Sequence, residues 1–188
     1  MQLKPILFNT EMVRAILDGR KTVTRRIIKP QPKSQVVFHL GNWQETQMQA
    51  NGLRILMPPF TVGDVLYVRE TWGQTADLLG ISEEDTVFAA DFTGKELAHL
   101  KDRHFRWRPS IHMPKELARL FLKVTAVQAE RLRQITVKDA YAEGLLIPTK
   151  FDEVWDSTVP RSVRSTYGWD ADPWVWVINF EVCEKPDK

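Results

Sequence analysis

The chain has 188 residues, 43% of them hydrophobic, and a formal net charge of +2. This composition fits one soluble domain with a core of its own, and it is not that of a strongly basic nucleic-acid-binding chain. No apolar run approaches the roughly 20 residues that cross a bilayer, and the first residues, MQLKPILFNTE, do not resemble a secretory signal. The single cysteine, Cys183, cannot form an internal disulfide. We therefore expect a cytoplasmic protein with no membrane partner, and we favour a monomer.

The first predicted element is a helix that Thr10 caps and Gly19 ends, with Met12, Val13, Ile16 and Leu17 on one side. The residues that follow, GRKTVTRR at 19–26, place one lysine and two threonine hydroxyls among three arginines. Like charges at neighbouring positions repel, so the cluster indicates anion binding or catalysis.

A structural alternative covers part of this cluster. Cations favour the negative end of a helix dipole, which accounts for Arg20 and Lys21 after the helix. It leaves the later residues unexplained. An extended backbone would divide the segment between two faces, with Thr22, Thr24 and Arg26 on one and Lys21, Val23 and Arg25 on the other.

The middle of the chain alternates between strands and connections. Residues 27–63 contain several prolines and predict a long connection with one hairpin, from 36–43 and 53–57. A strand is predicted at Val65–Arg69, and another at 86–91 inside a polar stretch.

The last third predicts a long strand at 119–130 and a closing strand at 174–182, whose Trp174 and Trp176 are expected in the core. Between them, two helices are each preceded by a threonine with an aspartate three residues later. These pairs, Thr136 with Asp139 and Thr149 with Asp152, fit the capping-box pattern.

Four stretches resemble, in the same order, the motifs of the ASCH domain family, small PUA-like β-barrels associated with RNA. They are ILDGRKTVTRR, GDVLYVRETW at 63–72, LKVTAVQAERLRQITVKDAYAEGL at 122–145, and PWVWVINFE at 173–181. The chain looks most similar to the longer members often encoded by prophages. The resemblance implies an α+β fold: one PUA-like small β-barrel over residues 1–188, with short helices and insertions near 27–62 and 73–108.

The resemblance also implies a chemistry. Small family members remove the acetyl group from N4-acetylcytidine with a lysine, a threonine and a glutamate, which correspond here to Lys21, Thr24 and Glu143. A hydroxyl would attack the acetyl carbonyl, a base would take its proton, and an acid would protonate the departing amine. Thr24 would be nucleophile, Lys21 base and Glu143 acid, provided that burial and nearby arginines lower the pKa of Lys21. The sequence has no zinc pattern and no phosphate-binding glycine loop, so we infer no metal and no cofactor.

Further residues are candidates for binding a modified nucleoside or RNA. In the first motif they are Arg20, Thr22 and Arg26, and in VRETW they are Arg69, Glu70 and Trp72, where a base could stack on the indole.

Other interpretations remain open. Thr24 could bond its own loop, Lys21 and Glu143 could form an inert ion pair, and Glu143 could be a solvated residue at a helix end. The second functional hypothesis is therefore a non-catalytic PUA-like module that binds RNA, with or without weak ribonuclease activity.

Overall fold

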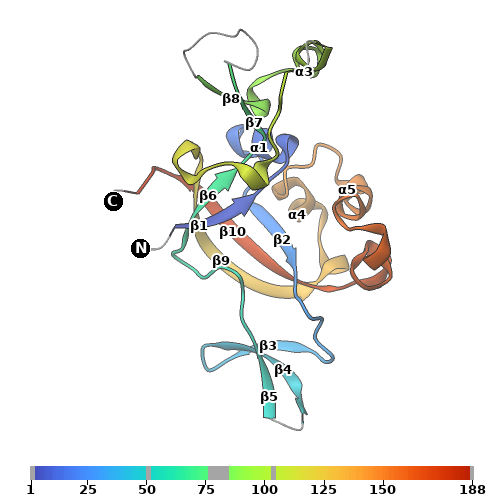
Figure 1. Cartoon of the computed structure of the whole chain (residues 1–188). Coiled ribbons are helices and arrows are strands. Elements are labelled where there is room, and N and C mark those ends of the chain that lie inside the picture. Colours follow the sequence, from blue (N-terminus) through green and yellow to red (C-terminus); the bar gives the residue numbers. More distant parts are fainter. Residues whose placement is uncertain (1–2, 50–51, 76–84, 103–104, 187–188) are drawn as a thin grey trace. The chain divides into compact units, whose positions relative to one another are not determined.

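The computed structural model in Figure 1 describes residues 3–49, 52–75, 85–102 and 105–186. Within them the chain forms two compact units. The first unit comprises residues 1–20, 64–123 and 182–188, and the second comprises residues 21–63 and 124–181. Parallel and antiparallel strand pairs occur together with short helices, which confirms the predicted α+β class. Closure of the strands into a barrel, and the assignment of the whole chain to one domain, stay predictions.

The first unit is built on a parallel strand pair. Strand β1 (Leu3–Leu7) runs beside β6 (Val65–Arg69), and β6 pairs antiparallel with the beginning of β9 (Phe121–Arg131). Its other elements are the helices α1 (Thr10–Leu17) and α3 (Gly94–Asp102), the hairpin strands β7 (Trp72–Gln74) and β8 (Thr86–Phe88), and 3-10 turns at Ala89–Asp91, Ser110–His112 and Lys115–Leu117. A core that includes Val65, Trp72, Met113 and Phe121 joins β6, β7 and the beginning of β9.

In the second unit, three neighbouring strands lie in the order β9-β10-β2. Strand β10 (Trp174–Cys183) pairs antiparallel with β2 (Val23–Ile27). A separate three-stranded sheet has the order β3-β4-β5, from β3 (Val36–His39), β4 (Asn42–Gln49) and β5 (Gly52–Leu56). The helices are α4 (Val137–Ala142), α5 (Phe151–Thr158) and α6 (Arg164–Tyr167), with 3-10 turns at Leu132–Gln134, Pro148–Lys150, Arg161–Val163 and Trp169–Ala171.

The core of this second unit lies between β2, β10 and the helices. Val23 of β2 and Val175 and Val177 of β10 pack with Ala140 of α4 and Trp155 of α5. Residues 174–178 of β10 are all buried, so both faces of this part of the strand are packed. Trp174 and Trp176 are both buried, as the sequence predicted.

Several sequence predictions need correction. Asn9, not Thr10, caps α1, because its side-chain oxygen accepts a 2.9 Å bond from the Met12 amide and Thr10 is already helical. The predicted hairpin at 36–57 is a three-stranded sheet, since the glutamine-rich residues 42–49 form a central strand that pairs on both edges. After Phe88 the strand predicted for 86–91 turns into a 3-10 helix.

The two predicted capping boxes have different outcomes. The first is confirmed, with Thr136 accepting from the Asp139 amide at 3.2 Å and Asp139 accepting from the Thr136 amide at 2.9 Å. The second is wrong. A 3-10 turn precedes α5, and Lys150 occupies the cap position without a side-chain hydrogen bond.

Within the described ranges, no helix combines the length and the apolar character needed to cross a membrane. Residues 76–84 and 103–104 of the insertion predicted near 73–108, including the acidic run at 82–84, lie outside the described residues.

Candidate functional site

Lys21 and Glu143 form a buried ion pair in the second unit. The Lys21 Nζ lies 2.6 Å from Oε2 of Glu143, and the two side chains are 1% and 7% exposed. Their backbones also meet in an isolated antiparallel bridge, next to a 2.8 Å bond from the Thr22 amide to the Ala142 carbonyl. Residues 122 positions apart in sequence are thereby brought together by both side chains and main chain.

The local fold explains how Glu143 reaches this position. The Thr136–Asp139 capping box begins α4, and Glu143 follows the last helical residue, with its amide donating to the Asp139 carbonyl at 2.8 Å. Gly144 then adopts a φ of +91°, a left-handed conformation that glycine accepts without steric cost. The short helix therefore starts and stops at fixed residues, and the glutamate projects from its end.

The Lys21 ammonium group has three acceptors. Besides Oε2 of Glu143, Nζ donates to the Glu143 carbonyl at 2.9 Å and to the Val23 carbonyl at 2.8 Å. An ammonium group has three N–H donors, so each one has a partner. Burial nevertheless lowers the pKa of Lys21 below its ordinary value of 10.5; Glu143 opposes this effect, while Arg26 and Arg25 add to it.

Arg25 binds the other oxygen of the same carboxylate. Its Nη1 lies 3.2 Å from Oε1 of Glu143, and its Nε donates to Oε1 of Glu130 on β9 at 2.8 Å. Its Nη2 lies 3.7 Å from Oδ2 of Asp139. The guanidinium, 2% exposed, therefore joins three carboxylates from β9 and α4.

Thr24 lies in β2, opposite Ile178 of β10, and is buried. Because β2 is extended over Val23–Ile27, Thr24 projects to the opposite face from Val23 and Arg25, as the alternation predicted. Across the described part of the chain, no hydrogen bond connects its hydroxyl to Lys21 or Glu143. The bond from Lys21 to the Val23 carbonyl does bring the ammonium beside the Val23–Thr24 peptide. The nucleophilic role of Thr24 stays a prediction.

The other candidates of the first motif occupy different environments. Arg20 belongs to the first unit and pairs with Asp18 at 2.8 Å. Thr22 is exposed. Arg26 is half-buried; burial lowers its pKa, and the charge of Glu143 opposes this change. The basic motif is therefore not a continuous cationic surface, because most of its charges have local partners.

The candidates in VRETW have contacts inside the first unit. Arg69 donates to the carbonyls of Met113, at 2.9 Å, and Ile111. Glu70 is buried and accepts from Arg119 at 3.0 Å and 3.1 Å. Trp72 is buried beneath the guanidinium of Arg108, 4.9 Å from the ring centroid. Their proposed contact with a substrate stays a prediction.

Sequence reasoning missed the partners of Arg25. The sequence indicated Arg25 as one of several cations that could lower the pKa of Lys21 or hold the negative oxygen of the reaction intermediate, and it indicated no role for Glu130. The alternation of the first motif does place Arg25 on the same face as Lys21, so the sequence did indicate that Arg25 lies near the Lys21 pair. Nothing local indicated that the end of a strand a hundred residues later would lie beside it.

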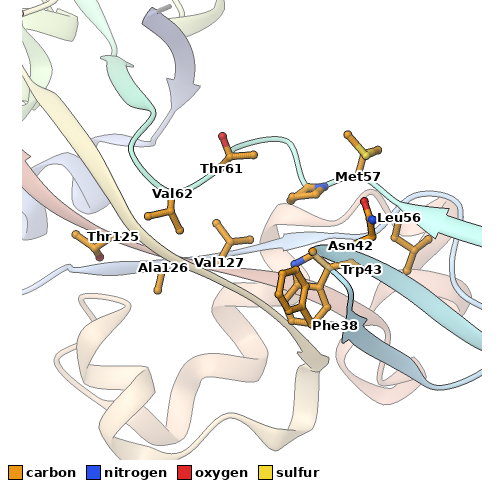
Figure 2. Close-up of a pocket in the computed structure, with 12 residues that line it drawn as sticks. Phe38, Asn42, Trp43, Leu56, Met57, Thr61, Val62, Thr125, Ala126 and Val127 are labelled. Carbon is orange, nitrogen blue, oxygen red and sulfur yellow. The ribbon is translucent and has the colours of Figure 1, made fainter. Parts of the chain in front are cut away.

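The structure also contains an apolar groove of about 520 Å³ in the second unit (Figure 2). Phe38 and Trp43 of the three-stranded sheet, Met57 and Val62 after it, and Val127 of β9 are among its lining residues. None of the predicted site residues lines it. Among the described residues, no group of three or more His, Cys, Asp or Glu side chains could hold a metal ion.

No protein-family model matches the chain, and no curated protein matches it. Among solved structures, it is similar to an ASCH domain from Lactobacillus crispatus JV V101, with 14% sequence identity and a TM-score of 0.45. That similarity covers 96% of this chain and 79% of the other. A likeness of this size supports no conclusion about residue roles.

Proposed function

We propose that the chain is an ASCH-family amidohydrolase that removes the acetyl group from N4-acetylcytidine or a related modified nucleoside. One observation carries the proposal: the buried 2.6 Å contact between Lys21 and Glu143. These are two of the three residues that the motif resemblance implied, and their position in two distant motifs gave no local reason for them to meet. A buried pair whose lysine has a lowered pKa is also the environment in which an amine can serve as a base.

The pair supports acid and base roles without a metal. When the proton moves from Lys21 Nζ to Oε2 of Glu143, the ion pair becomes a neutral amine beside a carboxylic acid. The amine then takes a proton from the attacking hydroxyl, and the acid gives its proton to the exocyclic nitrogen as the C–N bond breaks. The new C–O bond leaves the acetyl group on the attacking oxygen, and cytidine departs. If that oxygen belongs to water, the second product is acetate; if it belongs to an enzyme hydroxyl, a water molecule then hydrolyses the acetyl ester to acetate and restores the hydroxyl.

Two attacking groups are compatible with this scheme. Thr24 would form an acetyl-enzyme intermediate that water hydrolyses, in keeping with the motif resemblance. A water molecule activated by Lys21 would reach the same products directly. Full activity in Thr24→Ala would favour the water mechanism, whereas loss of activity together with an acetylated Thr24 in the wild type would favour the covalent one.

The decisive experiment incubates the purified protein with N4-acetylcytidine and follows cytidine and acetate by chromatography. We expect turnover in the wild type and none in Lys21→Met or Glu143→Gln. Circular dichroism of each variant controls for loss of the fold. A wild type that is inactive at high enzyme concentration would contradict the proposal and leave the RNA-binding module as the better hypothesis.

A further inference from the structure

Arg25 is the least exposed cation of the cluster after Lys21, and the enzymatic scheme assigns it no step. It extends from β2 on the face that also carries Val23, into a space bounded by β9 and α4. Its guanidinium is 2% exposed. Burial of a permanent charge is costly unless hydrogen bonds and opposite charges compensate for it, so the contacts of Arg25 need an explanation.

Lys21 and Arg25 hold different oxygens of one carboxylate. Oε2 of Glu143 accepts from Lys21 at 2.6 Å and Oε1 accepts from Arg25 at 3.2 Å. A single contact with an ammonium group would allow the carboxylate plane to rotate about it. A second contact on the other oxygen fixes that plane, and so fixes the direction in which Oε2 meets Nζ.

Arg25 is itself held in place. Glu130 accepts from its Nε at 2.8 Å, and Asp139 approaches its Nη2 at 3.7 Å. Asp139 is in turn held by the amide and hydroxyl of Thr136, at 2.9 Å and 2.6 Å. The planar guanidinium thus connects the end of β9 and the start of α4 to the carboxylate, and its orientation is set before any substrate arrives.

The charge of Arg25 also acts on the proton that, in the proposed scheme, moves between Lys21 and Glu143. The charged groups around the pair are Arg25 and Arg26 from β2, Glu130 from β9, and Lys138 and Asp139 from α4. Arg25 is one of the charges that lower the pKa of Lys21.

We propose that Arg25 is a positioning residue, which orients the Glu143 carboxylate toward Lys21 and sets how readily the proton passes between them. The catalytic part of this inference rests on the proposed function, but the effect on Lys21 does not. Arg25 does not need to touch the substrate in this role.

The test compares Arg25→Met and Arg25→Lys with the matched control Arg54→Met. Arg54 also pairs with a fully buried glutamate of the second unit, Glu45, at 2.8 Å, and it has no part in the proposed site. We expect kcat on N4-acetylcytidine to fall about 100-fold in Arg25→Met with little change in KM, to be intermediate in Arg25→Lys, and to be unchanged in Arg54→Met below its unfolding temperature.

A second readout does not require turnover. NMR titration of the Lys21 side chain should show a higher pKa in Arg25→Met than in the wild type, because a neighbouring positive charge is gone, and no change in Arg54→Met. In the active enzyme, the limb of the pH–rate profile that belongs to neutral Lys21 should move to higher pH accordingly.

The outcomes separate the two proposals. An inactive wild type would overturn the proposed function, while the Lys21 titration would still test Arg25. An unchanged Lys21 titration in Arg25→Met, or equal losses of kcat in Arg25→Met and Arg54→Met, would overturn the positioning role and leave a structural ion pair.

Discussion

Two buried glutamates, Glu143 in the second unit and Glu70 in the first, have different partners. Glu143 is shared between Lys21 and Arg25, both almost fully buried. Glu70 accepts from two nitrogens of one arginine, Nε and Nη2 of Arg119, which is one-third exposed and also bridges to Asp91 at 2.8 Å. Each glutamate lies in a stretch that resembles a family motif, and the resemblance implied the acid role for Glu143 and a binding role for Glu70.

The difference lies in what the partners can do with a proton. Burial raises the pKa of Glu70, with Arg119 opposing, and the bonds of Arg119 to Glu70 and Asp91 raise its own pKa despite its burial. An arginine does not give up its proton at physiological pH, so that pair can only attract. In the proposed mechanism, Lys21, whose pKa burial lowers, exchanges a proton with Glu143. The proposal therefore assigns a structural role to the ion pair of the first unit and a proton-exchanging role to the pair of the second.

The largest expected effect is on turnover. Lys21→Met should lower kcat/KM on N4-acetylcytidine by about 100-fold to 10,000-fold, the range for removal of a general acid–base group. Asp91→Asn, at the exposed end of the first-unit network, should leave the rate unchanged. Steady-state kinetics, measured at equal concentrations of folded wild type and variants, check this prediction. Equal rates in the two variants would remove the functional distinction between the pairs.

The next effect is on stability. Arg119→Met leaves the buried Glu70 without its cation and should lower the free energy of unfolding by about 3 kcal/mol, the lower end for breaking a buried ion pair. Asp91 is 44% exposed, so Asp91→Asn should cost only about 0–1 kcal/mol. Urea unfolding checks both values, and a cost for Arg119→Met no larger than that for Asp91→Asn would contradict a structural role for the Glu70 pair.

The pH dependence of stability should have opposite signs for the two pairs. The raised pKa of Glu70 means that, just above 4.5, the folded protein keeps a proton that the unfolded chain has released, so this contribution makes stability fall as pH rises. The lowered pKa of Lys21 means that, below 10.5, the folded protein releases a proton that the unfolded chain keeps, so stability rises with pH there.

Urea unfolding over a pH series isolates these contributions. The difference between wild type and Glu70→Gln should fall with increasing pH in the acid window. The difference between wild type and Lys21→Met should rise in the alkaline window. A slope of the opposite sign in either window would show that the pKa direction for that group is wrong.

The smallest effect concerns the helix that positions Glu143. Thr136→Ala removes a confirmed cap and should cost about 1 kcal/mol of stability. Thr149→Ala, at the predicted box that the structure lacks, should cost less than about 0.5 kcal/mol. Thermal unfolding of both variants provides the check. A larger loss for Thr149→Ala would mean that this threonine stabilises α5 in a way its missing cap bond does not explain.

Local patterns in the sequence determined much of the secondary structure. The strand at Val65–Arg69, the closing strand with its buried tryptophans and the capping box at Thr136 all depend on side chains within a few residues of one another. Local interactions also determined the alternation that separates Thr24 from Arg25. The errors had different causes: Asn9, the residue before Thr10, supplies the local cap bond, whereas the strand at 42–49 pairs with other segments on both of its edges.

Tertiary structure decided which charges meet. The motifs indicated Lys21 and Glu143 as candidates. Only the fold shows that Arg25 pairs with both Glu130 and Glu143, and that the other buried glutamate, Glu70, pairs with Arg119. The physical reason is that the energy of an ionisable side chain depends on its burial and on charges within a few ångströms, and those neighbours come from segments 49 to 122 residues away. Sequence by itself therefore named the ionisable groups, and the packing of distant segments set their protonation behaviour.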